Sequence, residues 1–159
     1  MTEEVYAALA ALNRERPRLC PLTQPFDANI KEHIDALEAT KAVRAALHLL
    51  NDDLYAAHEL VHPRPDYKPD RTSKLVHAIM HRREKNYLEA ERYWKLVDHP
   101  LLEELYDDHG GPIALQRLME RVDGKRVGEV KRGPLEDVQF DELKRVARWA
   151  IDHMDSEQS

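Results

Sequence analysis

Cysteine, glycine and long apolar runs are all scarce in this chain of 159 residues. The single cysteine, Cys20, cannot form an internal disulfide, and only five glycines are present, so disulfide-rich and Gly-rich low-complexity proteins are excluded. No apolar run approaches the roughly 18 residues of a membrane-spanning helix, and no secretory signal is recognised. We therefore expect a cytoplasmic protein with no membrane partner.

Positive charge is also in the minority. The chain has 24 Lys and Arg residues against 30 Asp and Glu residues, a formal net charge of -6. Nucleic-acid-binding domains usually carry a basic excess, so no nucleic-acid partner is expected. The residues that are abundant are Ala, Leu, Glu, Arg and Lys, which favour helix.

Apolar residues recur at helical spacing through most of the chain. Helices are predicted over about 2–12, 70–86, 87–97, 100–108 and 112–122, and from 137 or 141 to 154. Another helical stretch is predicted from 27 or 29 onward, with a strong period over 41–61, and a break near Thr40 and a continuous helix are both open. The predicted fold is all-α: an irregular bundle of about six to eight helices in a single domain (1–154), with a disordered tail (155–159). The one candidate for β structure is a short hairpin near 123–134, where a polar loop is an equal alternative.

Five of the nine histidines lie between Leu50 and Pro100. Two predicted helices in this stretch each carry a His-x-x-x-His pair, His58 with His62 and His77 with His81. Residues four apart share one face of a helix, and helices joined by a short loop tend to pack as antiparallel neighbours. We therefore expect imidazoles from the two helices to converge.

Imidazoles one helical turn apart can share a metal ion, provided that further ligands come from elsewhere. The predicted metal is a divalent ion, Zn, Fe or Mn. The predicted ligands are His58, His77 and His81, with Asp53, His62 or Glu84 as the fourth, and His99 as a further alternative.

Two arginines follow His81 directly, and guanidinium groups suit carboxylate or phosphate recognition. The hypothesis is a metal-dependent hydrolase in which Glu84, Arg82 and Arg83 are catalytic and the substrate is a small anionic molecule. The alternative for the arginines is surface ion pairing. Two other functions stay open: a metal-free site that uses His and Arg for acid-base or phosphate chemistry, and a non-enzymatic helical adaptor or homo-oligomer.

The string HELVH, from His58 to His62, also matches the HExxH motif of zincin metalloproteases. His62 precedes Pro63, however, and a residue before proline avoids helical geometry. No third histidine follows at the metzincin spacing. Peptidase activity is therefore the least favoured of these hypotheses.

Three further residues of this stretch have predicted surroundings. Asn51 falls on the helix face of His58, where it either meets solvent or orients an imidazole. Tyr93 is predicted to reach the site, whereas its neighbour Trp94 is predicted to lie in the core.

Residues 49–100 resemble a group of small uncharacterised helical proteins of bacteria and fungi. The shared pattern is LNDDL, a His five residues on, HAIMHRRE, Tyr-Trp and His-Pro. No activity of that group carries over to this chain, and Val76 stands where an aromatic residue is expected. The matching residues are Asn51, Asp52, Asp53, His58, His77, His81, Arg82, Arg83, Glu84, Tyr93, Trp94, His99 and Pro100.

Overall fold

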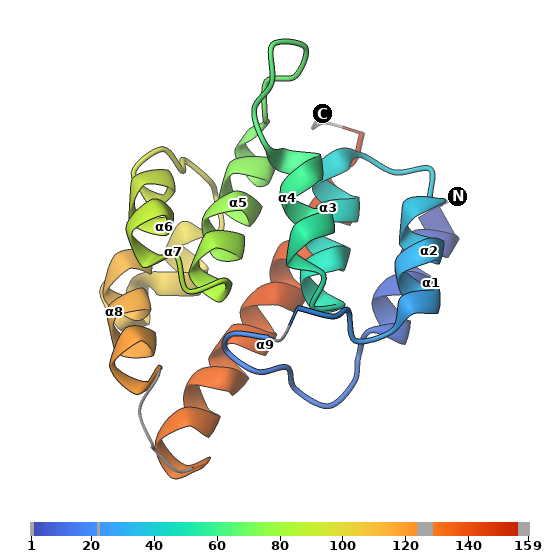
Figure 1. Cartoon of the computed structure of the whole chain (residues 1–159). Helices are drawn as coiled ribbons and strands as arrows, with labels where there is room; N and C mark the ends of the chain where they lie inside the picture. The colour runs from blue at the N-terminus through green and yellow to red at the C-terminus, as the bar shows by residue number, and fades with distance from the viewer. Residues whose placement is uncertain (1, 22, 124–128, 156–159) are drawn as a thin grey trace.

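Helices account for all the regular secondary structure in the computed structural model, which describes residues 2–21, 23–123 and 129–155 (Figure 1). No β-strand occurs within these residues, where the only β feature is an isolated bridge between Arg64 and Tyr67. The predicted all-α fold is confirmed. The helices are α1 (Thr2–Ala11), α2 (Ala28–Asp35), α3 (Lys41–Leu50), α4 (Leu54–Val61), α5 (Arg71–Arg83), α6 (Tyr87–Trp94), α7 (Leu102–Tyr106), α8 (Pro112–Val122) and α9 (Glu129–Asp152), with a 3₁₀ turn, η1 (Asp107–His109).

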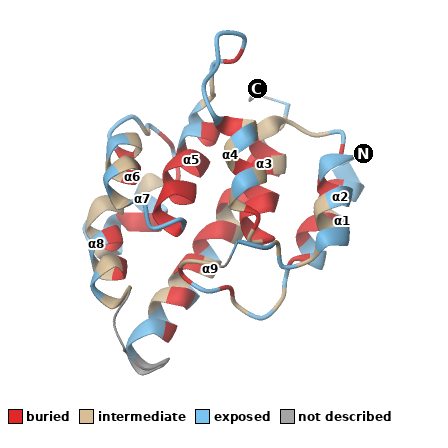
Figure 2. Cartoon of the chain, viewed as in Figure 1, coloured by how far each residue is buried: buried red, intermediate tan, exposed pale blue. Residues whose placement is uncertain are grey.

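Helix α5 lies at the centre of the bundle and packs against α3, α4, α6 and α9 (Figures 1 and 2). Its residues Leu75, Val76 and Ile79 are fully buried in a core to which every α-helix contributes. Burial of such side chains is worth about 1.5–3 kcal/mol each, so packing rather than intrinsic propensity holds these short helices. No helix in the described part of the chain is long and apolar enough to cross a membrane.

The helix predicted over 41–61 is two helices in the structure. It breaks at Asn51–Asp53, where Asp52 adopts a left-handed conformation with φ of 58°. Asp and Asn tolerate this conformation better than most residues. Asp53 then begins α4 as its N-cap, because its Oδ1 accepts a hydrogen bond from the Ala56 N–H at 3.1 Å. This break gives nine α-helices within the described residues, not six to eight.

The hairpin near 123–134 is not formed in the part that the structure describes. Residues 124–128 lie outside the described residues, and 129–134 belong to α9, which therefore begins before the predicted start at 137 or 141. Pro134 lies inside this helix, at a cost of about 3 kcal/mol in a helix interior. Burial of Leu143, Val146 and Ala147 further along α9 offsets this cost. Of the predicted tail, 156–159 also lie outside the described residues.

The loop from 62 to 70 joins α4 to α5 and brings them side by side in opposite directions (Figure 1). Three prolines in this loop prevent either helix from continuing. Asp70 caps the first turn of α5 by accepting a hydrogen bond from the Ser73 N–H at 2.7 Å. The two His-x-x-x-His pairs therefore lie on adjacent antiparallel helices.

Candidate metal centre

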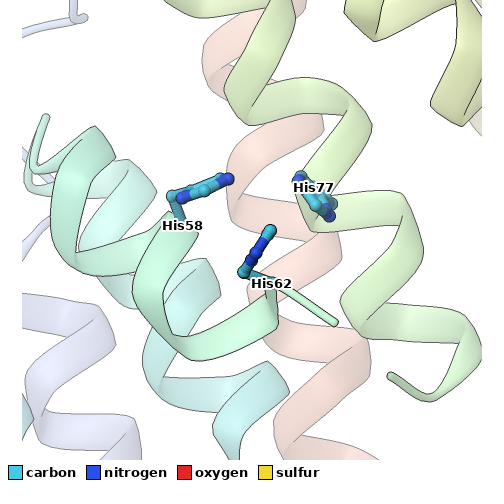
Figure 3. Close-up of side chains that lie close together, drawn as sticks. All are labelled: His58, His62 and His77. Atoms are coloured by element: carbon cyan, nitrogen blue, oxygen red, sulfur yellow. The ribbon is translucent and has the colours of Figure 1, made fainter. Parts of the chain in front are cut away.

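Four imidazoles line the contact between α4 and α5. His58 and His62 extend from α4 toward His77 on α5 (Figure 3). The ring centre of His58 is 4.8 Å from that of His62, 5.1 Å from that of His77 and 5.4 Å from that of His81. His58 is therefore the imidazole that all the others surround, as the helical spacing of the two pairs implies.

Three of these rings have metal-ligand geometry. One nitrogen each from His58, His62 and His77 lies within 4.8 Å of the other two. Two imidazole nitrogens on a tetrahedral Zn²⁺ lie about 3.4 Å apart, given a Zn–N distance of 2.0–2.1 Å. The separation of the three nitrogens exceeds this spacing by at most about 1.4 Å.

His77 is the most deeply placed member of the cluster, with 1% of its surface exposed. Its Nε2 is buried and has no hydrogen-bond partner. A buried polar atom without a partner costs about 1–3 kcal/mol, and such atoms are rare in folded proteins. A ligand bound at this nitrogen would satisfy it.

The imidazoles of His58 and His77 are neutral at physiological pH. Burial is the main cause that lowers the pKa of His77, to about 3, and the neighbouring imidazoles of His81, His58 and His62 lower it further. Burial also lowers the pKa of His58, with smaller effects from His81 and His62. Neutral imidazole is the form that binds metal ions.

The side chain of His81 is hydrogen-bonded to that of Glu84. Its Nδ1 lies 2.5 Å from Oε1 of Glu84, and its ring centre lies 4.7 Å from that of His77. Because the carboxylate of Glu84 accepts a hydrogen bond from a protonated Nδ1, the Nε2 lone pair of His81 is available to another ligand. Glu84, predicted as a fourth ligand or a catalytic group, is thus a hydrogen-bond partner of a predicted ligand.

Tyr93 of α6 covers the α5 side of the cluster. Its ring stacks on those of His77, at 3.9 Å between centres, and His81, at 5.3 Å. The prediction that Tyr93 reaches the site agrees with this position. Trp94 faces the core with 4% of its surface exposed, also as predicted.

Asp53, another predicted fourth ligand, lies at the opposite end of α4 from His62. Asp53 and His58 are five positions apart, which corresponds to about 7.5 Å along a helix. One of its carboxylate oxygens caps α4, and the carboxylate acts electrostatically on His48 and Lys31. Asp53 is therefore not brought together with the histidines.

Arg82 and Arg83 are not at the site either, contrary to the prediction that they hold an anionic substrate. Arg82 is 1% exposed and donates two hydrogen bonds to the Glu142 carboxylate, at 2.9 and 2.6 Å, and one to Oε1 of Gln139. The Tyr106 hydroxyl donates to the same carboxylate at 2.7 Å. This buried network ties α5 to α9.

Arg83 is fully buried on another side of α5. It donates to the backbone carbonyls of Leu49, Leu19 and Arg18, and to Oδ1 of Asp52 at 2.8 Å. The physical reason for the misplacement is that successive residues on a helix point about 100° apart, so the neighbours of His81 turn toward the core. The alternative of surface ion pairs is equally wrong for both arginines.

The LNDDL segment forms the corner between α3 and α4. The amide of buried Asn51 donates to the Asp27 carbonyl and accepts from the Asp27 N–H. Asp52 forms ion pairs with Arg14 and Arg83, at 2.7 and 2.8 Å. Asn51 therefore neither meets solvent nor orients an imidazole, because the break in the helix turns it away from the face of His58.

His99 is used within the core. Its Nδ1 accepts a hydrogen bond from the Leu101 N–H, so Nε2 carries the proton and donates to the Thr72 hydroxyl at 3.0 Å. With both ring nitrogens occupied, His99 has no lone pair to offer to a metal ion.

Carboxylates supply charge around the cluster. Glu84 and Glu59 act on His58 and favour its charged form, and Glu89 acts on Tyr93. Negative charge beside neutral imidazoles favours a bound cation. Glu59, the residue that the HExxH motif would use as a base, is exposed on α4.

Comparison with known proteins leaves the site to be interpreted from its own geometry. No family model, no curated protein and no solved structure matches this chain. The resemblance of residues 49–100 to a group of small helical proteins stays a prediction.

Proposed function

We propose that this protein binds a divalent transition-metal ion between α4 and α5, with His58, His62 and His77 as ligands. The observation that carries the proposal is that one ring nitrogen each of His58, His62 and His77 lies within 4.8 Å of the other two, in a cluster where the buried Nε2 of His77 has no hydrogen-bond partner. A metal ion would accept one lone pair from each of the three rings. With Nε2 as the ligand atom of His77, this buried nitrogen would then have a partner.

The chemistry of the donors narrows the choice of metal. Imidazole suits Zn, Cu, Fe and Ni, whereas carbonyl and carboxylate oxygens suit Mg, Ca and Mn. Because no carboxylate is among the three ligands, Zn²⁺ and Ni²⁺ are favoured over Mn²⁺, one of the ions named from the sequence.

Hydrolysis is the reaction that such a centre would serve best. A metal ion held by three imidazoles keeps an open position, and it lowers the pKa of a water molecule there toward 7. The buried arginines take no part, so a small anionic substrate would be held by the positive metal ion itself. A metal-free acid-base site is the alternative, and it predicts insensitivity to chelators.

Metal titration of the untagged, chelator-treated protein tests the proposal. We expect about one Zn²⁺ or Ni²⁺ per chain, and about 2.7 kcal/mol of added stability when free metal is 100 times its Kd. The measurements are calorimetric titration and thermal unfolding. His77→Ala should lose both effects.

His33→Ala is the matched control, because His33 is exposed on α2 and outside the cluster. It should bind metal as the unchanged protein does. Equal loss in both variants, or no binding by the unchanged protein, contradicts the proposal.

A further inference from the structure

We infer that Glu84 is a positioning residue that makes His81 a fourth ligand of the metal centre. The inference rests on the proposed function. His81 lies outside the group of His58, His62 and His77. Among the described imidazoles, the ring of His81 is the one that is hydrogen-bonded to the Glu84 carboxylate.

The orientation of His81 is fixed from two sides. Glu84 holds Nδ1 at 2.5 Å, and the ring lies nearly parallel to Tyr93, with an interplanar angle of 17°. His77 stacks on the same tyrosine at 28°. Both α5 imidazoles are thus held on one aromatic surface, with their ring centres 4.7 Å apart.

The lone pair of His81 is directed by its partner. With the Nδ1 proton shared with a carboxylate, Nε2 is the only nitrogen that can bind a metal ion. The ring of His58 lies 5.4 Å from this ring, close to its distances from His62 and His77. Among the rings near His58, His81 therefore follows directly after His62 and His77 in distance between ring centres.

The position of Glu84 at the end of α5 brings its carboxylate to this ring. It is the C-cap of α5, and the left-handed residue Lys85, with φ of 68°, ends the helix directly after it. The side chain lies one turn beyond His81, and its backbone N–H bonds to the Met80 carbonyl. Carboxylates that orient metal-bound histidines in this way typically account for 10- to 100-fold in metal affinity.

A fourth imidazole changes what the centre offers to other ligands. Four nitrogens would complete a tetrahedral ion, so the open position that hydrolysis needs would exist only when one imidazole leaves the metal. His62 is the exposed member of the set, at the end of α4 before Pro63. It is the ligand that can give way most easily, because little packing holds it.

Three variants separate orientation from charge. Glu84→Ala removes the acceptor and its charge, and Glu84→Gln keeps an oxygen acceptor without the charge. Glu89→Ala removes a carboxylate that acts on Tyr93 and pairs with Arg92. The measurement is competitive titration with Zn²⁺ and Co²⁺, combined with X-ray absorption to count the imidazoles on the metal. Circular dichroism of each metal-free variant checks that it folds.

We expect Glu84→Ala to weaken metal binding about 10- to 100-fold, Glu84→Gln to recover part of this loss, and Glu89→Ala to stay within about twofold. The unchanged protein should show four imidazoles on the metal, and His81→Ala should show three. Equal weakening by Glu84→Ala and Glu89→Ala, or three imidazoles in the unchanged protein, overturns the inference but leaves the proposed metal site standing. Failure of the unchanged protein to bind metal overturns both.

Discussion

The buried polar side chains on two sides of α5 differ in how completely their polar atoms are paired. Toward the core, Arg82 and Arg83 donate to carboxylates, a side-chain amide and backbone carbonyls, and only Nε of Arg82 has no partner. Toward α4, His77 leaves Nε2 without a partner, and His81 is held by the carboxylate of Glu84. Adjacent positions of one helix thus serve opposite purposes.

The difference follows from the charge of each group. A guanidinium stays charged when buried, so the fold must supply an anion and acceptors for it. An imidazole can be buried in its neutral form, and leaving one nitrogen unsatisfied costs only about 1–3 kcal/mol. The nearly complete pairing of the buried guanidinium groups therefore indicates a structural role, and the unpaired neutral nitrogen of His77 is a feature that supports the proposed metal site.

Substitution of Arg82, whose guanidinium is paired in the core, should have the largest effect on stability. Arg82→Ala is expected to lower the free energy of unfolding by about 3–5 kcal/mol, because it leaves Glu142 buried without its cation. Urea denaturation measures this loss. Arg117→Ala is the control, since Arg117 pairs with Glu91 at the surface, and it should change stability by no more than about 0.5 kcal/mol. Similar values for the two variants would remove the distinction between buried and surface pairs.

His77, on the side of α5 that faces α4, should make the stability of the metal-free protein depend on pH in the acidic range. The pKa of His77 is about 3 in the folded chain, below its ordinary value of 6.5, so the unfolded chain binds more protons between these pH values. The contribution of His77 to the free energy of unfolding is therefore fully present above pH 6.5. It decreases as the pH is lowered toward 3, by up to about 1.4 kcal/mol per pH unit.

Urea denaturation at a series of pH values, with chelator present, measures this dependence. His77→Ala should show a shallower slope between pH 6.5 and pH 3 than the unchanged protein, whatever its stability at neutral pH. An unchanged slope would mean that His77 is readily protonated in the folded state.

The smallest effect on stability is expected from substitution of Asp53. This variant tests helix capping and metal binding separately on α4. Asp53→Ala should cost about 1 kcal/mol, because the Ala56 N–H loses its side-chain acceptor. Its metal affinity should stay equal to that of the unchanged protein, as measured by the same calorimetric titration. A loss of affinity above tenfold would restore Asp53 as a ligand.

The sequence by itself determined the helical class, the His-x-x-x-His spacing and the pairing of α4 with α5. These features depend on local geometry: the helical period sets which residues share a face, and a short Pro-rich loop makes neighbouring helices antiparallel. The contact between His58 and His77 follows from these two rules. That a metal ion occupies the centre stays a prediction.

The tertiary structure alone decided which charged residues turn inward. Arg82 and Arg83 lie next to His81, but their partners Glu142 and Asp52 are distant in sequence, and no local pattern predicts that they meet. The same holds for Asn51, whose bonds to the loop at Asp27 end α3, and for α9, which continues through Pro134. Each of these outcomes depends on burial and pairing between segments that only the folded chain brings together.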